Sequence, residues 1–86
     1  MARPAIAFIT DFGTRDHYVG AMKGVVLGIC PEVSLVDITH EIRPRDLLEA
    51  AFVLERSFRE FQRRTVFVVM VDSALAMPRQ IGRAHV

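Results

Sequence analysis

The most informative chemistry in this chain follows its first apolar run. Asp11 comes directly after Ala5–Thr10, Gly13 follows in the same turn, and Asp16 precedes a segment with helical spacing. In open α/β sheets, ligands bind at the carboxyl ends of the strands. We expect an acidic turn with free backbone donors, which suits a ligand rich in hydroxyls and amines. A phosphate cradle is not predicted, because the run of glycines and the lysine of a P-loop are missing.

Polar residues also follow the two later candidate strands. Asp37 lies within residues 34–39, His40 comes next, and Asp72 follows residues 65–71. If the strands are parallel, their carboxyl ends meet at one edge of the sheet. Converging carboxylates can bind a divalent cation, bind a ribose diol and an ammonium group, or act in acid–base catalysis. The residue types alone leave these three uses open.

Each of these polar residues also has a structural interpretation. Aspartate is favoured in turns and at helix N-caps, which would account for Asp11 and Asp16 without a ligand. The position at a strand end favours a ligand role for Asp11, whereas Asp16 suits capping and ligand binding equally. Asp37 alternates with apolar residues and is expected to be structural. His40 is expected to be a loop residue, since a lone histidine is weak evidence for a metal or a base.

The hydrophobic pattern predicts that these residues are positioned by strands and helices in the order β-α-β-α-β. Three apolar runs have strand length, and two segments between them have the 3.6-residue spacing of helices. The expected strands are residues 5–10, 34–39 and 65–71, and the expected helices are residues 17–30 and 45–61. Strands that are apolar on both faces and alternate with helices predict an α/β fold with a parallel sheet. We interpret it as the truncated start of a three-layer (α/β/α) Rossmann-like domain.

Two features of the expected elements concern packing. The second helix carries an apolar stripe, and the first has glycines every four residues. Each of those glycines costs about 0.5–1 kcal/mol relative to alanine, so we expect that helix to pack closely on the sheet. Three strands leave an edge open, and residues 66–71 would be an aggregation hazard there. The stripe comprises Leu47, Leu48, Ala51, Phe52, Leu54, Phe58 and Phe61, and the glycines are Gly20, Gly24 and Gly28.

Composition limits the classes of function. The 86 residues suffice for one small domain, and a net charge of +1 gives no footprint for nucleic acid or an acidic membrane. The single cysteine excludes an internal disulfide and a cysteine zinc site. We expect no signal peptide or membrane span, and a cytoplasmic location. We expect residues 1–80 to be a partial N-terminal domain and residues 81–86 to be read-through of a sequencing adapter, whose translation they resemble.

The ordered motifs resemble the start of the S-adenosyl-L-methionine (SAM) hydroxide adenosyltransferase family, relatives of the fluorinases and chlorinases. The resemblance covers most of residues 5–72 at the spacing of the family. It is carried by Thr10-Asp11-Phe12-Gly13, Asp16, Tyr18-Val19-Gly20, Met22-Lys23-Gly24, Val36-Asp37-Ile38-Thr39-His40-Glu41-Ile42, Pro44, Asp46, Glu49-Ala50-Ala51-Phe52-Val53-Leu54 and Val71-Asp72.

The resemblance implies hydrolysis of SAM to adenosine and methionine by attack of water or hydroxide on ribose C5′, without a metal or cofactor. It assigns Asp11 to the ribose hydroxyls and Asp16 to the methionine ammonium. It implies that Asp72 and Arg79 hold the attacking water, together with a histidine that comes later in the sequences of the family. Asp72 favours hydrolysis over halogenation, because halogenating relatives carry an uncharged residue there. Residues 73–76 depart from the family's Pro-Gly-Val-Gly, which puts the placement of Arg79 in doubt.

The family's site lies between neighbouring subunits of a trimer, so the resemblance also implies a homotrimer and little turnover by this chain alone. Two alternatives remain open. One is a Mg²⁺-dependent phosphohydrolase or receiver-like domain that uses the carboxylates, which EDTA would inactivate. The other is a nucleoside-binding module, which would bind SAM or adenosine without forming product.

Overall fold

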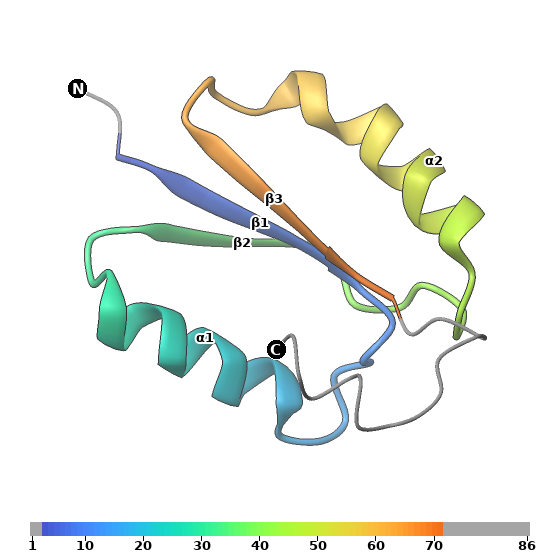
Figure 1. Ribbon diagram of the computed structural model, residues 1–86, viewed down its shortest axis with the longest axis horizontal. Helices are drawn as coiled ribbons and strands as arrows, with labels where there is room; N and C mark the ends of the chain where they lie inside the picture. The colour runs from blue at the N-terminus through green and yellow to red at the C-terminus, as the bar shows by residue number, and fades with distance from the viewer. Residues whose placement is uncertain (1–2, 72–86) are drawn as a thin grey trace.

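The fold is built from three strands and two helices in strict alternation. The computed structural model describes residues 3–71; Asp72, Arg79 and residues 73–76 and 81–86 lie outside them. The elements are β1 (Ala5–Thr10), α1 (Tyr18–Ile29), β2 (Ser34–Thr39), α2 (Leu47–Ser57), the short 3-10 helix η1 (Phe58–Glu60) and β3 (Thr65–Met70), as Figure 1 shows. The predicted α/β class is confirmed.

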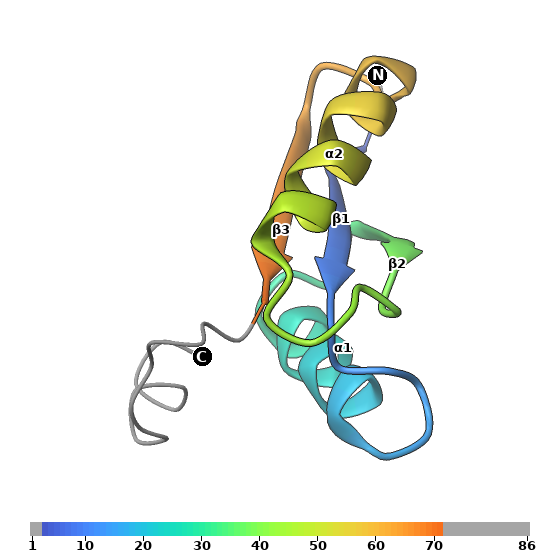
Figure 2. The ribbon, with the colours of Figure 1, turned by 90° about the vertical axis from the view of Figure 1, so that its right-hand side faces the viewer.

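The sheet is parallel throughout, with the strand order β2-β1-β3. In Figure 2, α2 lies on one face of the sheet and α1 on the other. The central strand β1 is almost entirely buried, because strands flank it on both edges and helices on both faces. Since all three strands run in the same direction, their carboxyl ends lie at one edge of the sheet. The sheet therefore provides the parallel strand ends at which the polar residues were predicted to gather.

The helix α2 begins later than its apolar pattern predicts. Arg45 has a φ of 63°, which lies outside the helical region, and Asp46 is the N-cap, whose side chain accepts a hydrogen bond from the Glu49 amide at 2.9 Å. Glu49 in turn accepts a hydrogen bond from the Arg43 amide at 2.9 Å. The Asp46 side chain thus caps the helix, and Glu49 bonds the segment before the cap rather than the Asp46 amide, as it would in a capping box. The predicted start at Arg45 was therefore wrong by two residues.

One face of α2 packs on the sheet. Ala50 is buried with Ile9 and Ile42, and Val53 and Leu54 pack against this cluster. Most of the predicted stripe lies elsewhere: Leu48 is 84% exposed, and Leu47, Phe52 and Phe58 are also exposed. The helix α2 is apolar on more than one face, and the sheet covers only the face that carries Ala50.

The glycines of α1 do not pack closely on the sheet. No atom of the described residues lies within 4 Å of a Cβ built on Gly20, Gly24 or Gly28, apart from the helix itself. Only Val19 of α1 is buried. The expectation of close packing was therefore wrong for the part of the chain that the structure describes.

The strand β3 forms one edge of the sheet. Within residues 3–71 it pairs with β1 alone, and Val66 is 59% exposed. Among the described residues β2 also pairs with β1 alone, so β3 is one of two open edges of the sheet. Neither described helix has the length and hydrophobicity needed to cross a membrane.

Candidate functional site

The backbone amides of the turn after β1 donate hydrogen bonds to neighbouring parts of the chain. The amide of Asp11 donates to the Met70 carbonyl at 3.3 Å, and that of Gly13 donates to the His40 carbonyl at 2.7 Å. Between them, the Phe12 amide donates to Thr10 Oγ1 at 3.2 Å. The expectation of free backbone donors was wrong for these three residues, because the neighbouring strands and the Thr10 hydroxyl already use them. A ligand at this turn would be recognised mainly by side chains.

The Asp11 carboxylate connects this turn to the segment before α2. Its Oδ2 accepts a hydrogen bond from the Arg45 amide at 3.2 Å. Gly13, with a φ of 73°, and Arg45, with a φ of 63°, both adopt the left-handed conformation beside it. Arginine rarely adopts this conformation, and strained backbone tends to occur at functional sites. Asp11 as a whole is half-buried.

Asp16 lies at the other end of the same loop and is exposed. Its Oδ1 accepts a hydrogen bond from the amide of Tyr18, the first residue of α1, at 3.2 Å. An acidic side chain here also compensates the positive end of the helix dipole. The N-cap of α1 is His17, and no side chain caps this helix, so the predicted capping by Asp16 was wrong. Asp16 bonds the Tyr18 amide from the turn one residue earlier, and its ligand role stays a prediction.

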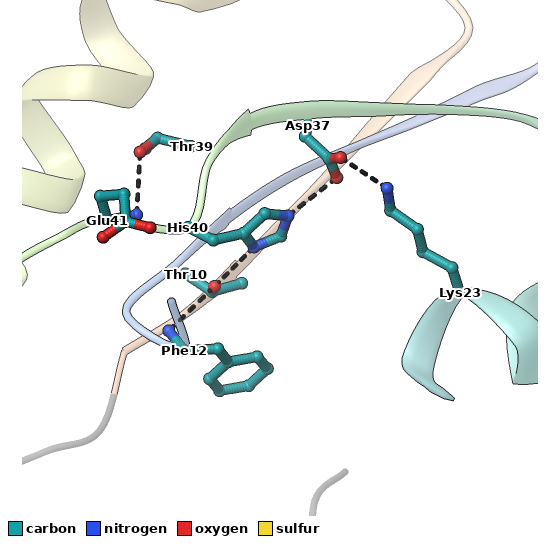
Figure 3. Close-up of polar contacts among 7 residues, drawn as sticks. All are labelled: Thr10, Phe12, Lys23, Asp37, Thr39, His40 and Glu41. Atoms are coloured by element: carbon teal, nitrogen blue, oxygen red, sulfur yellow. Dashed lines mark hydrogen bonds and ion pairs between the residues drawn. The ribbon is translucent and has the colours of Figure 1, made fainter. Parts of the chain in front are cut away.

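A chain of polar contacts, buried at its Thr10–His40 end and exposed at its Asp37–Lys23 end, lies behind the turn (Figure 3). The Thr10 hydroxyl is 2.7 Å from His40 Nδ1, and His40 Nε2 is 2.8 Å from Asp37 Oδ1. Lys23 Nζ, from α1, completes the chain with an ion pair to Asp37 Oδ2 at 2.5 Å. The structural role expected for Asp37 is confirmed. His40 is more than the expected ordinary loop residue, because it is only 4% exposed and both of its ring nitrogens are bonded.

The same contacts set the charge of Asp37. Burial by itself would raise the pKa of this carboxyl. Hydrogen bonds from Lys23 and His40, with the positive charge of Lys23, outweigh burial and lower the pKa below its ordinary value of 3.8. Asp37 is therefore ionised at neutral pH and acts as the anionic partner of both residues.

The structure brings only some of the predicted site residues to the carboxyl edge of the sheet. Asp11 lies in the turn at this edge and contacts the segment before α2, while Asp16 lies at the far end of the loop, at the start of α1. Asp72 and Arg79 lie outside the described residues. Within residues 3–71, no three histidine, cysteine, aspartate or glutamate side chains are grouped so that they could hold a metal ion.

Sequence reasoning missed Arg45 and the pairing of Thr10 with His40. A weak signal existed for the pair, since each follows or ends an apolar strand. Only the adjacency of β1 and β2 brings the two side chains together. No local pattern marks the left-handed backbone of Arg45.

Comparisons with known proteins agree with this architecture. The model of the SAM hydroxide adenosyltransferase N-terminal domain matches residues 6–84. A fluorinase of Nocardia brasiliensis is 43% identical over 65 residues, which are 76% of this chain and 22% of that protein. An (R)-S-adenosyl-L-methionine hydrolase of Methanocaldococcus jannaschii is 37% identical over 79 residues, which are 87% of this chain and 30% of that protein.

A solved structure shares the fold. The crystal structure of an uncharacterized conserved protein from Thermotoga maritima superposes with a TM-score of 0.77 at 43% sequence identity, over 81% of this chain and 27% of that one. The chain thus spans less than a third of each of these three relatives.

Proposed function

Because the chain belongs to the SAM hydroxide adenosyltransferase family through its N-terminal domain, we propose that it is the N-terminal part of an enzyme that hydrolyses SAM to adenosine and L-methionine. The match over residues 6–84 is the observation that carries this proposal. The acidic turn at the carboxyl edge of the parallel sheet supports it independently, since this edge is where such sheets bind ligands.

The reaction needs a positioned nucleophile more than a strong acid. An oxygen of water or hydroxide forms a bond to ribose C5′ while the bond from C5′ to sulfur breaks. The electron pair of that bond goes to sulfur, which leaves as the neutral thioether of methionine, and the water gives its proton to solvent. An enzyme accelerates such a step by aligning the two reactants in a pocket that excludes other water.

We assign Asp11 to the ribose hydroxyls. A carboxylate can accept several hydrogen bonds, and the Arg45 amide supplies one of them from the protein side. We assign Asp16 to the methionine ammonium, which the exposed position of this carboxylate supports. For Asp72 and Arg79, the resemblance to the family supports a role in holding the attacking water. An arginine beside that water would favour its hydroxide form.

A halide-transferring enzyme is the second candidate. Its support is the 43% identity to the fluorinase of Nocardia brasiliensis. In that reaction a halide attacks C5′, and the products are methionine and a 5′-halogenated nucleoside. Asp72 favours water, because a carboxylate next to the nucleophile repels an anion and accepts a hydrogen bond from water.

We further propose that the complete enzyme is a cytoplasmic homotrimer that needs no metal or cofactor. The resemblance supports the trimer, and a substrate that is made inside cells supports the location. Since the chain spans 30% of the hydrolase relative, we expect residues beyond it to complete the site. The chain alone is then expected to bind SAM weakly and to turn over little.

A hybrid enzyme tests the reaction. Residues 1–72 of this chain would replace the aligned segment of the Methanocaldococcus jannaschii hydrolase, and mass spectrometry would follow SAM, adenosine and methionine. We expect adenosine and methionine in equal amounts, with no change on adding EDTA. An Asp11→Asn variant should lose at least about tenfold in kcat/KM, the effect of losing one charged hydrogen bond. In a second hybrid that takes residues 1–80 from this chain, Arg79→Lys with unchanged turnover would exclude the proposed role of Arg79.

Other outcomes of the same experiment identify the alternatives. A 5′-halogenated nucleoside formed in the presence of fluoride or chloride would establish the second candidate. Inactivation by EDTA, with phosphate release from a phosphorylated substrate, would point to the phosphohydrolase. Binding of SAM without product, in a hybrid whose parent is active, would leave a nucleoside-binding module.

A further inference from the structure

His40 is a buried histidine that the proposed reaction does not use. Its side chain is 4% exposed, and each ring nitrogen has one partner: Thr10 Oγ1 at 2.7 Å and Asp37 Oδ1 at 2.8 Å. Figure 3 shows the ring in line between these two residues. Burying an imidazole with both nitrogens bonded restricts it to one orientation.

The partners restrict where the ring protons can lie. Asp37 is ionised, so His40 Nε2 must carry a proton to face its carboxylate at 2.8 Å. Thr10 Oγ1 already accepts a hydrogen bond from the Phe12 amide, and its own proton can then be donated to His40 Nδ1. This arrangement gives every proton an acceptor when the ring is the neutral Nε2–H tautomer. The opposite neutral tautomer would place two acceptors face to face.

His40 therefore acts on the turn that carries Asp11 in two ways. Through Thr10, its side chain orients the hydroxyl that holds the Phe12 amide. Through its own carbonyl, it accepts the hydrogen bond from the Gly13 amide at 2.7 Å. These two amides directly follow Asp11, so both contacts limit the positions that the Asp11 carboxylate can reach.

The far end of the contact chain fixes the helix that follows. Asp37 holds Lys23 of α1 at 2.5 Å as well as the His40 ring. The loop between β1 and α1 is thus tied to the end of β2 at its start and at the helix into which it leads. That loop carries both Asp11 and Asp16.

From these contacts we propose that His40 is a positioning residue: held as the neutral Nε2–H tautomer between Thr10 and Asp37, it fixes the turn of residues 11–13 so that the Asp11 carboxylate meets its ligand. The ligand named here, the ribose of adenosine or SAM, rests on the proposed function. The positioning of the turn does not depend on it.

Four variants separate positioning from general stability. Thr10→Val removes the hydroxyl while keeping the shape, and Thr10→Ser keeps the hydroxyl. His40→Gln places its amide near the Nε2 position and loses the contact with Thr10. His40→Asn places its amide near the Nδ1 position and keeps that contact. Thr10→Val and His40→Gln thus lose the contact between residues 10 and 40, whereas Thr10→Ser and His40→Asn keep it.

The first measurement needs no ligand. In the ¹⁵N-labelled chain, we expect imidazole shifts of the Nε2–H tautomer at neutral pH. The Phe12 and Gly13 amides should exchange with solvent about tenfold faster in Thr10→Val and His40→Gln than in Thr10→Ser and His40→Asn, the effect of one lost hydrogen bond. Amides of β1 serve as the reference for global stability. Equal exchange at the turn in all four variants would refute the positioning role.

The second measurement adds the ligand. The titration uses the hybrid enzyme described above, in which the site is complete. Titration of this hybrid with adenosine and with SAM should show affinity weakened about tenfold in Thr10→Val and His40→Gln. In Thr10→Ser and His40→Asn the affinity should stay within about threefold of the parent hybrid. If the parent binds and all four folded variants bind equally well, the positioning role is excluded and the proposed function stands. If the parent binds neither probe, the proposed ligand is wrong, and the exchange data alone decide whether His40 holds the turn.

Discussion

At the scale of single residues, the polar side chains behind the Asp11 turn bond to one another: Thr10, His40, Asp37 and Lys23. No buried side-chain nitrogen or oxygen in the described part of the chain lacks a hydrogen-bond partner. Removing one member leaves another without its partner, which costs more than the net gain of the bond itself. Substitutions in this set should therefore be felt in stability as well as in the site.

The lowered pKa of Asp37 predicts a specific pH dependence. A carboxyl whose pKa is lower in the folded state stabilises the protein above its unfolded pKa, and this contribution is lost as the pH falls through the folded value. We therefore expect the contribution to be present above about pH 4 and to disappear below the ordinary value of 3.8.

Urea unfolding at several pH values tests this expectation with Asp37→Asn. At pH 7 the variant should lose about 0.5–1 kcal/mol, a small effect because Asp37 is 38% exposed and solvent screens its ion pair. Below pH 3 the difference from the parent should shrink. A difference that stays constant from pH 7 to pH 3 would show that the Asp37 charge contributes nothing.

Arg45 stores backbone strain beside Asp11. Its φ of 63° costs about 1–2 kcal/mol for a residue with a Cβ, and glycine removes this cost at an entropic penalty of about 0.5–1 kcal/mol. We expect Arg45→Gly to raise the free energy of unfolding by about 0.5 kcal/mol and Arg45→Val to lower it by about 1 kcal/mol. Chemical denaturation measures both. Equal stability of the two variants would contradict the strain, because the amide that bonds Asp11 is kept in each.

At the scale of elements, glycine has opposite meanings in the loop and in α1. Gly13 has a φ of 73°, which the turn requires, whereas the three glycines of α1 have ordinary helical backbone. Within residues 3–71, none of the four has another atom within 4 Å of the position of an added Cβ, apart from its chain neighbours and its own helix backbone. Backbone conformation alone therefore decides the effect of adding a methyl group.

Two alanine substitutions test this contrast. Gly24→Ala should stabilise the chain by about 0.5–1 kcal/mol, since it removes the entropic cost of glycine in an exposed helix. Gly13→Ala should destabilise it by about 1–2 kcal/mol, since alanine is strained at positive φ. Thermal and urea unfolding give both values. A destabilised Gly24→Ala would mean that α1 is covered by another part of the protein or by a second subunit.

At the scale of the whole molecule, much apolar surface lies uncovered by residues 3–71. The edge strand β3 exposes Val66 and Val69, and α2 exposes Leu48 and Phe52. An edge strand with unpaired backbone groups is a template for pairing with another chain. Exposed apolar helix faces offer a second route to association.

Lysine substitutions distinguish these two routes. If the edge dominates, Val66→Lys should suppress concentration-dependent association, because an edge charge blocks strand pairing, and Leu48→Lys should not. Light scattering and sedimentation measure the association, and both variants add the same charge. Suppression by Leu48→Lys alone would assign the association to α2 instead.

The local sequence determined the elements of this protein. The predicted bounds of β1 and β2 match the structure, and those of α1 and β3 lie within one residue of it. Apolar runs bounded by polar turns, and the alternation of strand with helix, are properties of neighbouring residues. They specify a parallel α/β sheet and place Asp11 at its carboxyl edge without any knowledge of long-range contacts.

The tertiary structure alone decided how the site is assembled. The order β2-β1-β3 places His40 against Thr10, thirty positions earlier, and brings the Arg45 amide to Asp11, thirty-four positions earlier. It also decides that Ala50 and not Leu48 faces the sheet. Burial, proton positions and backbone strain depend on which segments meet in space, and residues so far apart in sequence carry no local pattern that says they will meet.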